Sequence, residues 1–139
     1  MSDNETPMSP KPGHISWNEL TTADPTSSAS FYGKLFGWQT VPFVVPGGPT
    51  DEPPYMVFKT DAANATDPGV GGMMAAPAPG VPTHWIPYVV VKDADVSLAK
   101  AVELGAKALM PVMAIGEVGR VAVIQDPLGA VIGLHELPR

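Results

Sequence analysis

The sequence predicts an α+β domain built from two βαβββ modules, on three observations. The chain has 139 residues, a length that suits one ordinary domain. Hydrophobic residues make up 45% of it, which is enough for a buried core and too much for a wholly disordered chain. The same order of structural landmarks occurs twice along the chain, so we interpret the sequence as an internal duplication.

The first half has the pattern of a strand, a helix and three further strands. Asp24 suits the N-cap of the helix, and Pro25 suits its first turn because proline has no N–H to leave unpaired there. Apolar residues recur at helical spacing up to Gly37, which ends the helix because glycine adopts the left-handed conformation at little cost. The strands of this half are predicted over residues 15–20, 41–45, 55–59 and 70–74.

The second half repeats this pattern. It has a predicted helix over residues 93–104 and predicted strands over 84–91, 107–114, 121–125 and 130–135. Gly105 ends its helix 68 residues after Gly37, and the turn 126–129 matches the turn 67–69 with one residue inserted. Neither half is long enough to bury its own sheet face, so we expect the halves to share a core. We predict a flexible tail over 1–13 and a single domain over 14–139, with modules at about 14–78 and 82–137.

Composition excludes several classes of function. Eight Lys and Arg against 14 Asp and Glu give a formal net charge of −6, which argues against nucleic acid or an anionic membrane as a partner. Cysteine is absent, so disulfides, zinc–thiolate sites, iron–sulfur clusters and a thiol nucleophile are excluded. No apolar run approaches the roughly 18 residues that span a bilayer, and the acidic start is unlike a signal peptide. We therefore expect a cytoplasmic protein.

Two motifs resemble those of a known superfamily. The segment 24–38 contains Asp24-Pro25, then Phe31-Tyr32-Gly33-Lys34-Leu35-Phe36-Gly37-Trp38, and Asp126-Pro127-Leu128-Gly129 leads into the last predicted strand. Over residues 14–137 the chain resembles the glyoxalase / bleomycin-resistance / extradiol-dioxygenase proteins, the vicinal oxygen chelate superfamily. Segments 71–74 and 84–88 are most similar to a glyoxalase-like subgroup of undefined activity. The resemblance implies an eight-stranded incomplete barrel, or cup, with the ligand inside, and a homodimer.

The resemblance also implies where a metal would bind. Enzymes of the superfamily usually hold a divalent ion with His, Glu or Gln side chains on the first and fourth strands of each half. The matching positions here are Trp17, Met73, Ile86 (or Trp85) and Gly133, none of which can ligate a hard divalent ion. We therefore predict no metal and no other cofactor.

Three alternatives stay open at this stage. Glu19, His84 and His135 could meet in the cup and form a non-standard metal site. With or without such a metal site, Glu19 could act as the general base of a glyoxalase-like lyase or isomerase, because burial in an apolar strand would raise its pKa. The third alternative is an interaction protein whose cup is packed and holds no ligand. Whether the protein is an enzyme is left open.

The function predicted first is metal-independent binding of a small, partly aromatic organic molecule, as in the bleomycin-resistance proteins that the chain resembles. Aromatic and thioether side chains on the presumed cup strands suit an apolar, planar ligand. Tyr55 and Met74 are among these cup-strand residues. The residues predicted to bind the ligand are Trp17, Met73, His84, Trp85, Tyr88 and His135.

Overall fold

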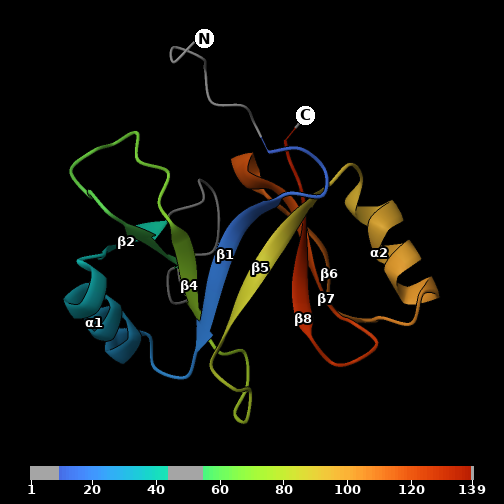
Figure 1. The fold of residues 1–139 in the computed structure, drawn as a ribbon, viewed down its shortest axis with the longest axis horizontal. Coiled ribbons are helices and arrows are strands. Elements are labelled where there is room, and N and C mark those ends of the chain that lie inside the picture. Colours follow the sequence, from blue (N-terminus) through green and yellow to red (C-terminus); the bar gives the residue numbers. More distant parts are fainter. Residues whose placement is uncertain (1–9, 44–54, 139) are drawn as a thin grey trace.

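One curved sheet of eight strands organises the chain (Figure 1). The computed structural model describes residues 10–43 and 55–138. The elements, in chain order, are β1 (Ile15–Thr22), α1 (Pro25–Phe36), β2 (Gln39–Phe43), β3 (Tyr55–Lys59), β4 (Gly71–Ala75), β5 (His84–Val91), α2 (Ala94–Glu103), β6 (Lys107–Ile115), the short 3-10 turn η1 (Gly116–Val118), β7 (Gly119–Gln125) and β8 (Val131–Glu136).

The strand order shows the duplication directly. It runs β2-β3-β4-β1-β5-β8-β7-β6, so each half contributes four neighbouring strands. Within each half the first and fourth strands pair in parallel, β1 with β4 and β5 with β8. The antiparallel pair β1–β5 joins the two halves at the centre of the sheet. The predicted α+β architecture of two βαβββ modules is confirmed.

Both helices pack on the same face of the sheet, one over each half, and Figure 1 shows them at opposite ends. Leu20, Phe58 and Met73 are buried together beside residues of α1, and Ala122, Ile124 and Leu134 beside residues of α2. The opposite, concave face of the sheet is left free for the cup. Within the described residues, no helix is both long and apolar enough to cross a membrane.

The helix ends lie where the sequence predicts them. The Asp24 carboxylate accepts a hydrogen bond from the Ser27 N–H at 3.1 Å, and Gly37 ends α1 with a φ of 76°. β2 begins at Gln39, two residues before the predicted strand 41–45, and residues 44–45 of that prediction lie outside the described part. The first nine residues of the predicted tail also lie outside it, whereas the Gly13 N–H already donates to the Val90 carbonyl oxygen at 2.8 Å.

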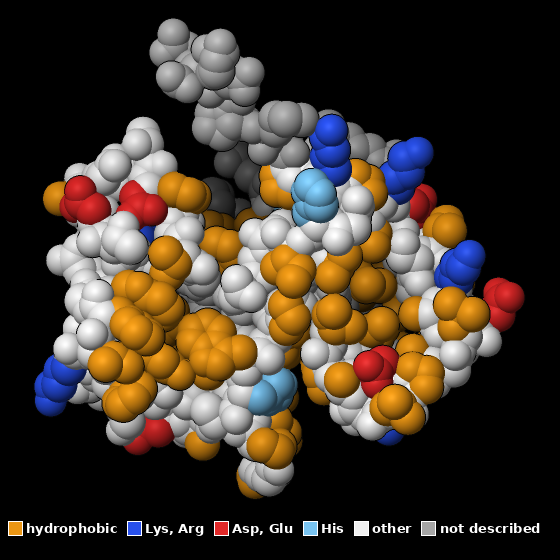
Figure 2. Space-filling view, in the orientation of Figure 1, with side chains coloured by type: hydrophobic (Ala, Val, Ile, Leu, Met, Phe, Trp, Pro, Cys, Tyr) orange, Lys and Arg blue, Asp and Glu red, His pale blue; other side chains and the backbone are white. Residues whose placement is uncertain are grey.

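The outer side of α1 is apolar and exposed. Phe31, Leu35 and Phe36 are each more than half exposed, at 59%, 58% and 56%. Figure 2 shows hydrophobic side chains gathered over this part of the surface. This surface faces away from the cup, so its apolar character is independent of any ligand site.

Candidate functional site

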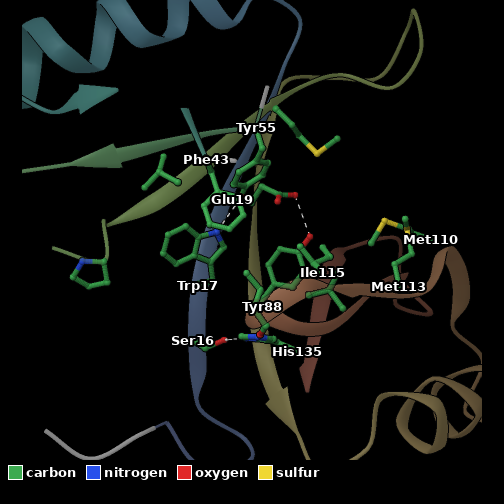
Figure 3. Close-up of a pocket in the computed structure, with 15 residues that line it drawn as sticks. Ser16, Trp17, Glu19, Phe43, Tyr55, Tyr88, Met110, Met113, Ile115 and His135 are labelled. Atoms are coloured by element: carbon green, nitrogen blue, oxygen red, sulfur yellow. Dashed lines mark hydrogen bonds between the residues drawn. The ribbon is translucent and has the colours of Figure 1, made fainter. Parts of the chain in front are cut away.

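The cup contains a cavity of about 450 Å³ (Figure 3). Most of the side chains around it are apolar, and the polar ones are few. The described lining residues are Ser16, Trp17, Glu19, Phe43, Tyr55, Val57, Pro68, Met74, Tyr88, Met110, Met113, Ile115, Val118, Val121 and His135. An apolar cavity of this size with a few convergent polar groups is typical of small-molecule sites.

A β-bulge on β1 brings an extra side chain into the cavity. The pairing of β1 with β5 shifts register between Ile15 and Trp17. Regular alternation would direct Ser16 away from the face that holds Trp17 and Glu19, but all three line the cavity. The strand therefore supplies a hydroxyl, an indole and a carboxyl to one site.

Glu19 is the only acidic side chain among the described lining residues, and it is just 8% exposed. The Tyr88 hydroxyl donates to its Oε1 at 3.0 Å, and the Tyr55 hydroxyl is a second hydrogen-bonding neighbour. The Trp17 Nε1–H in turn donates to the Tyr55 hydroxyl oxygen at 3.0 Å. Figure 3 shows the Trp17–Tyr55 and Tyr88–Glu19 contacts on either side of the carboxyl.

Burial raises the pKa of the Glu19 carboxyl above its usual value. The hydrogen bonds from Tyr55 and Tyr88, and the charge of His84, lower the same pKa and offset the effect of burial only in part. Burial and the adjacent Glu19 charge also raise the pKa of both tyrosines, which therefore stay protonated as donors. The site combines a proton-binding carboxyl with two fixed hydroxyl groups.

Two glycines make room for these tyrosines. Gly72 lies opposite Glu19 on β4, and Gly133 lies opposite Tyr88 on β8. A Cβ at Gly72 would come within 2.5 Å of Tyr55 Cε1, and a Cβ at Gly133 within 2.6 Å of Tyr88 Cγ. Any larger residue at either position would have to displace a tyrosine ring.

A second polar group in the cavity pairs Ser16 with His135. His135 Nε2 lies 2.7 Å from the Val118 carbonyl oxygen, which can only accept, so this nitrogen has the proton. In the neutral ring, Nδ1 then accepts from the Ser16 hydroxyl at 2.8 Å. The two contacts fix the ring and leave the serine oxygen as an acceptor toward the cavity.

The structure places the predicted site residues in two groups. Trp17, Glu19, Tyr88 and His135 line the cavity, and their functional roles stay predictions. Met73, His84 and Trp85 do not line the cavity, which corrects their expected places in the cup, and their role in ligand binding likewise stays a prediction.

The alternation of the strands explains these corrections. Met73 pairs with Leu20 and Trp85 with Leu20, all on the helix-bearing face. Trp85 donates from Nε1 to the Tyr32 hydroxyl at 3.1 Å, and His84 Nδ1 contacts the Pro82 carbonyl oxygen at 2.7 Å. The cup position on β4 that matches Gly133 is Gly72, one residue before the predicted Met73.

The donor set of the cup does not fit the divalent metal site of the superfamily. The cup-facing positions of the four central strands include Gly72, Ile86 and Gly133, which have no ligating side chain. Within the described part of the chain, no three His, Asp or Glu side chains gather closely enough to hold an ion. The alternative cluster of Glu19, His84 and His135 is therefore not formed.

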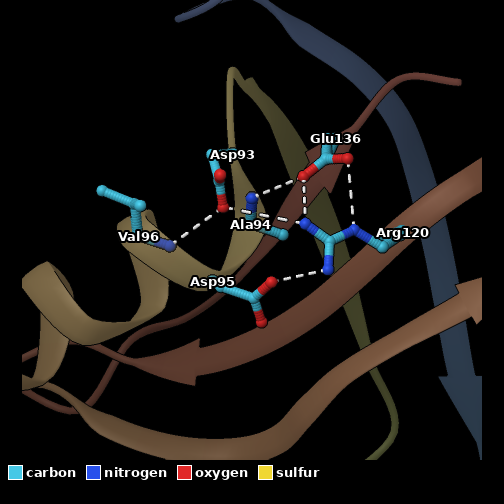
Figure 4. A network of polar contacts seen from close by, with 6 residues as sticks. All are labelled: Asp93, Ala94, Asp95, Val96, Arg120 and Glu136. Atoms are coloured by element: carbon cyan, nitrogen blue, oxygen red, sulfur yellow. Dashed lines mark hydrogen bonds and ion pairs between the residues drawn. The ribbon is translucent and has the colours of Figure 1, made fainter. Parts of the chain in front are cut away.

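The main cluster of charged groups lies outside the cup (Figure 4). Arg120 on β7 pairs with Glu136 on β8 at 2.5 Å and with Asp95 on α2 at 2.6 Å. The Glu136 carboxylate also accepts from the Ala94 N–H at 2.9 Å, and Asp93 accepts from the Val96 N–H as the N-cap of α2. This network joins the start of α2 to the sheet.

Comparison with known proteins agrees with this architecture. A family model described as a glyoxalase-like domain matches residues 17–135. This chain belongs to the glyoxalase-like domain family. The glyoxalase-like chain is also 38% identical, over 122 residues and 88% of its length, to a Mycobacterium tuberculosis protein named "Putative glyoxylase CFP32". It is 32% identical, over 86% of its length, to the anthracycline biosynthesis protein DnrV of Streptomyces peucetius.

The glyoxalase-like chain spans 43% and 45% of these two relatives, which is less than half of each. Among solved structures, it matches a methylmalonyl-CoA epimerase from Streptomyces coelicolor with a TM-score of 0.56, over 93% of this chain and all of that one. It matches homoprotocatechuate 2,3-dioxygenase from Brevibacterium fuscum with a TM-score of 0.55, over 94% of this chain and 39% of that one. Both are 16% identical to it, and they show the shared vicinal oxygen chelate fold.

Proposed function

We propose that this glyoxalase-like protein binds a small organic molecule in its cup and that binding needs no divalent metal. The observation behind the proposal is a buried carboxyl, Glu19, set among hydroxyl donors in a cavity whose walls are mostly apolar. Apolar walls supply most of the binding free energy of such sites, and a few fixed polar groups orient the ligand.

The walls favour a flat, partly aromatic ligand. Trp17, Phe43, Tyr55 and Tyr88 present rings to the cavity, and Met74, Met110 and Met113 add flexible thioethers. The name of the relative DnrV, an anthracycline biosynthesis protein, also makes fused-ring compounds the first candidates to test.

Tryptophan fluorescence tests this proposal, because the described tryptophans lie in distinct places. Trp17 lines the cavity, whereas Trp85 contacts Tyr32 on the helix-bearing face. A planar anthraquinone titrated into the protein should quench emission in the wild type and in Trp85→Phe. The quenching should largely disappear in Trp17→Phe. Quenching that survives in Trp17→Phe and disappears in Trp85→Phe would place the ligand outside the cup.

A second candidate is a lyase or isomerase that uses Glu19 as its general base. The observation that favours it is the position of a carboxyl of raised pKa inside the cavity, since a base of this kind is suited to abstracting a proton next to a carbonyl. The Tyr55 and Tyr88 hydroxyls, which donate to Glu19 while it is ionised, become available to a developing enolate oxygen once Glu19 has taken the proton.

Proton exchange separates this candidate from binding alone. A bound ketone should exchange its α-protons with deuterated water faster in the wild type than in Glu19→Gln. Equal exchange in the two proteins, with the ketone bound to both, would remove Glu19 from any catalytic role.

We also propose that two copies of the chain associate. The exposed apolar residues of α1 favour association, because exposed apolar patches are unfavourable in water. Light scattering should give about twice the 14.5 kDa mass of one chain. A mass of one chain over the whole accessible range of concentration would contradict it.

A further inference from the structure

We propose that the ligand of the cup has an organic ammonium group, and that this group pairs with the Glu19 carboxylate. The inference rests on the proposed function, because it names the chemical class of the molecule that the cup would bind. It follows from two observations: the hydrogen bonds around Glu19 suit a negatively charged carboxylate, but the described residues that line the cavity include no Lys or Arg to pair with that charge.

The hydrogen bonds around Glu19 suit an anion. The Tyr88 hydroxyl donates to Oε1. The Tyr55 oxygen already accepts from Trp17 Nε1–H, which leaves the Tyr55 proton to be donated to Glu19. A carboxylate only accepts, so two such donors match its ionised form. Because Gly72 and Gly133 have no side chain, the rings of Tyr55 and Tyr88 can lie where they make these contacts.

The charges around the cavity do not balance this anion. The described lining residues include no Lys and no Arg, and their single basic side chain, His135, is engaged with Ser16 and the Val118 carbonyl. On β5, the charge of His84 lowers the pKa of Glu19, but its side chain lies outside the lining. On β3 and β4, the neighbours are Tyr55, Gly72 and Met74.

A buried carboxylate in a protein is normally paired with a cation or protonated. Among the described lining residues no Lys or Arg pairs with Glu19, which agrees with the raised pKa of its carboxyl. A ligand that brings its own positive charge would supply the missing partner and favour ionisation.

The rest of the cavity selects an organic cation over a metal ion. Among the described lining residues Glu19 supplies the single carboxylate, and the tyrosine and serine hydroxyls beside it are neutral, so the set is too poor in anionic oxygen for a hard divalent ion, which takes six or more oxygen ligands. The rings of Trp17, Phe43, Tyr55 and Tyr88 attract ammonium groups through their negative faces, and they also bury an apolar body. An amine attached to a flat hydrocarbon would pair with the Glu19 carboxylate and pack against the aromatic walls.

Calorimetric titration with three matched probes tests the inference. The probes are 1-naphthylmethylamine, 1-naphthylmethanol and 1-naphthoate, which share a ring system and differ in charge. At neutral pH the wild type should bind the amine about 10- to 100-fold more tightly than the alcohol, the range expected for a charge-assisted hydrogen bond in a buried site. It should bind the carboxylate most weakly, because that probe adds a second anion.

Two variants isolate the role of the carboxyl. Glu19→Gln should bind amine and alcohol with nearly equal affinity. Glu103→Gln, on the exposed surface of α2, removes the same charge away from the cup and should keep the preference for the amine.

Titrations of the wild type in buffers of different ionisation enthalpy, from about pH 5 upward, should also show proton release with the amine. Neither the alcohol nor Glu19→Gln should show this release.

The outcomes separate the inference from the function on which it rests. Equal binding of amine and alcohol by the wild type would overturn the ammonium assignment and leave the cup as a binding site. A preference for the amine that persists in Glu19→Gln would overturn it as well. Failure of all three probes to bind the folded wild type would count against both the assignment and the proposed function.

Discussion

Replacing Gly72 by alanine tests how the cup positions Tyr55. An added Cβ would lie within 2.5 Å of Tyr55 Cε1 and closer still to the hydroxyl end of the ring. Since non-bonded heavy atoms pack favourably at about 3.5–4.0 Å, the Cε1 atom has to retreat by about 1 Å and the hydroxyl end of the ring by more. This movement breaks the 3.0 Å hydrogen bond from Trp17 Nε1 and removes a donor from Glu19.

Overpacking of this kind costs about 1–3 kcal/mol of unfolding free energy. With a urea m-value of about 2 kcal/mol/M, the unfolding midpoint of Gly72→Ala should fall by about 1 M. Gly33→Ala is the matched control, because the same change in α1 brings its Cβ only to 3.2 Å from one backbone oxygen. Alanine is also favoured over glycine inside a helix, so this control should lose little stability.

A double-mutant cycle identifies the clashing group. Tyr55→Val removes the ring atoms that the new Cβ would meet, so adding Gly72→Ala to Tyr55→Val should cost much less than adding it to the wild type. The reasoning is refuted if Gly72→Ala costs the same free energy in both backgrounds.

Two further predictions concern charged groups. Because burial raises the folded-state pKa of Glu19, the folded protein holds a proton between the ordinary glutamate pKa of about 4.3 and its own raised value. The stability of the wild type should therefore fall as pH rises through this window, by about 1.4 kcal/mol per unit of pKa elevation. Glu19→Gln should lack that fall in urea titrations, and parallel pH profiles for the two proteins would contradict it. Arg120→Met should lower the melting temperature, because it removes the guanidinium from Glu136, which is only 5% exposed. Asp95→Ala, at an exposed end of the same network, should change the melting temperature little, and an equal loss in both variants would argue against the role of Glu136.

Local rules were sufficient to predict most of the fold. The Asp24 cap, the Gly37 stop and the repeated turns follow from short-range backbone chemistry, which the sequence contains directly. The duplication predicts that the two halves pair their strands alike, as β1 with β4 and β5 with β8 do, whereas the cup itself was expected from the resemblance to the superfamily.

The candidate site could be predicted only in part, because the faces of strands depend on register. A one-residue shift exchanges the two faces, and this is why Gly72 rather than Met73 lies in the cup. The bulge that turns Ser16 toward His135 has no clear local signal in the sequence. The contacts of Tyr55 with Trp17 and Glu19 join strands far apart in the chain, so spacing alone could not predict them.

Metal content measured together with ligand binding tests the central claim most directly. The tag-free protein is titrated with 1-naphthylmethylamine before and after treatment with a chelator, and the metal in each sample is determined by elemental analysis. The account predicts sub-stoichiometric metal in both samples and the same affinity for the probe. Stoichiometric metal in the untreated protein, with loss of binding when it is removed, would contradict the proposal that Glu19, Tyr55 and Tyr88 form a metal-free site.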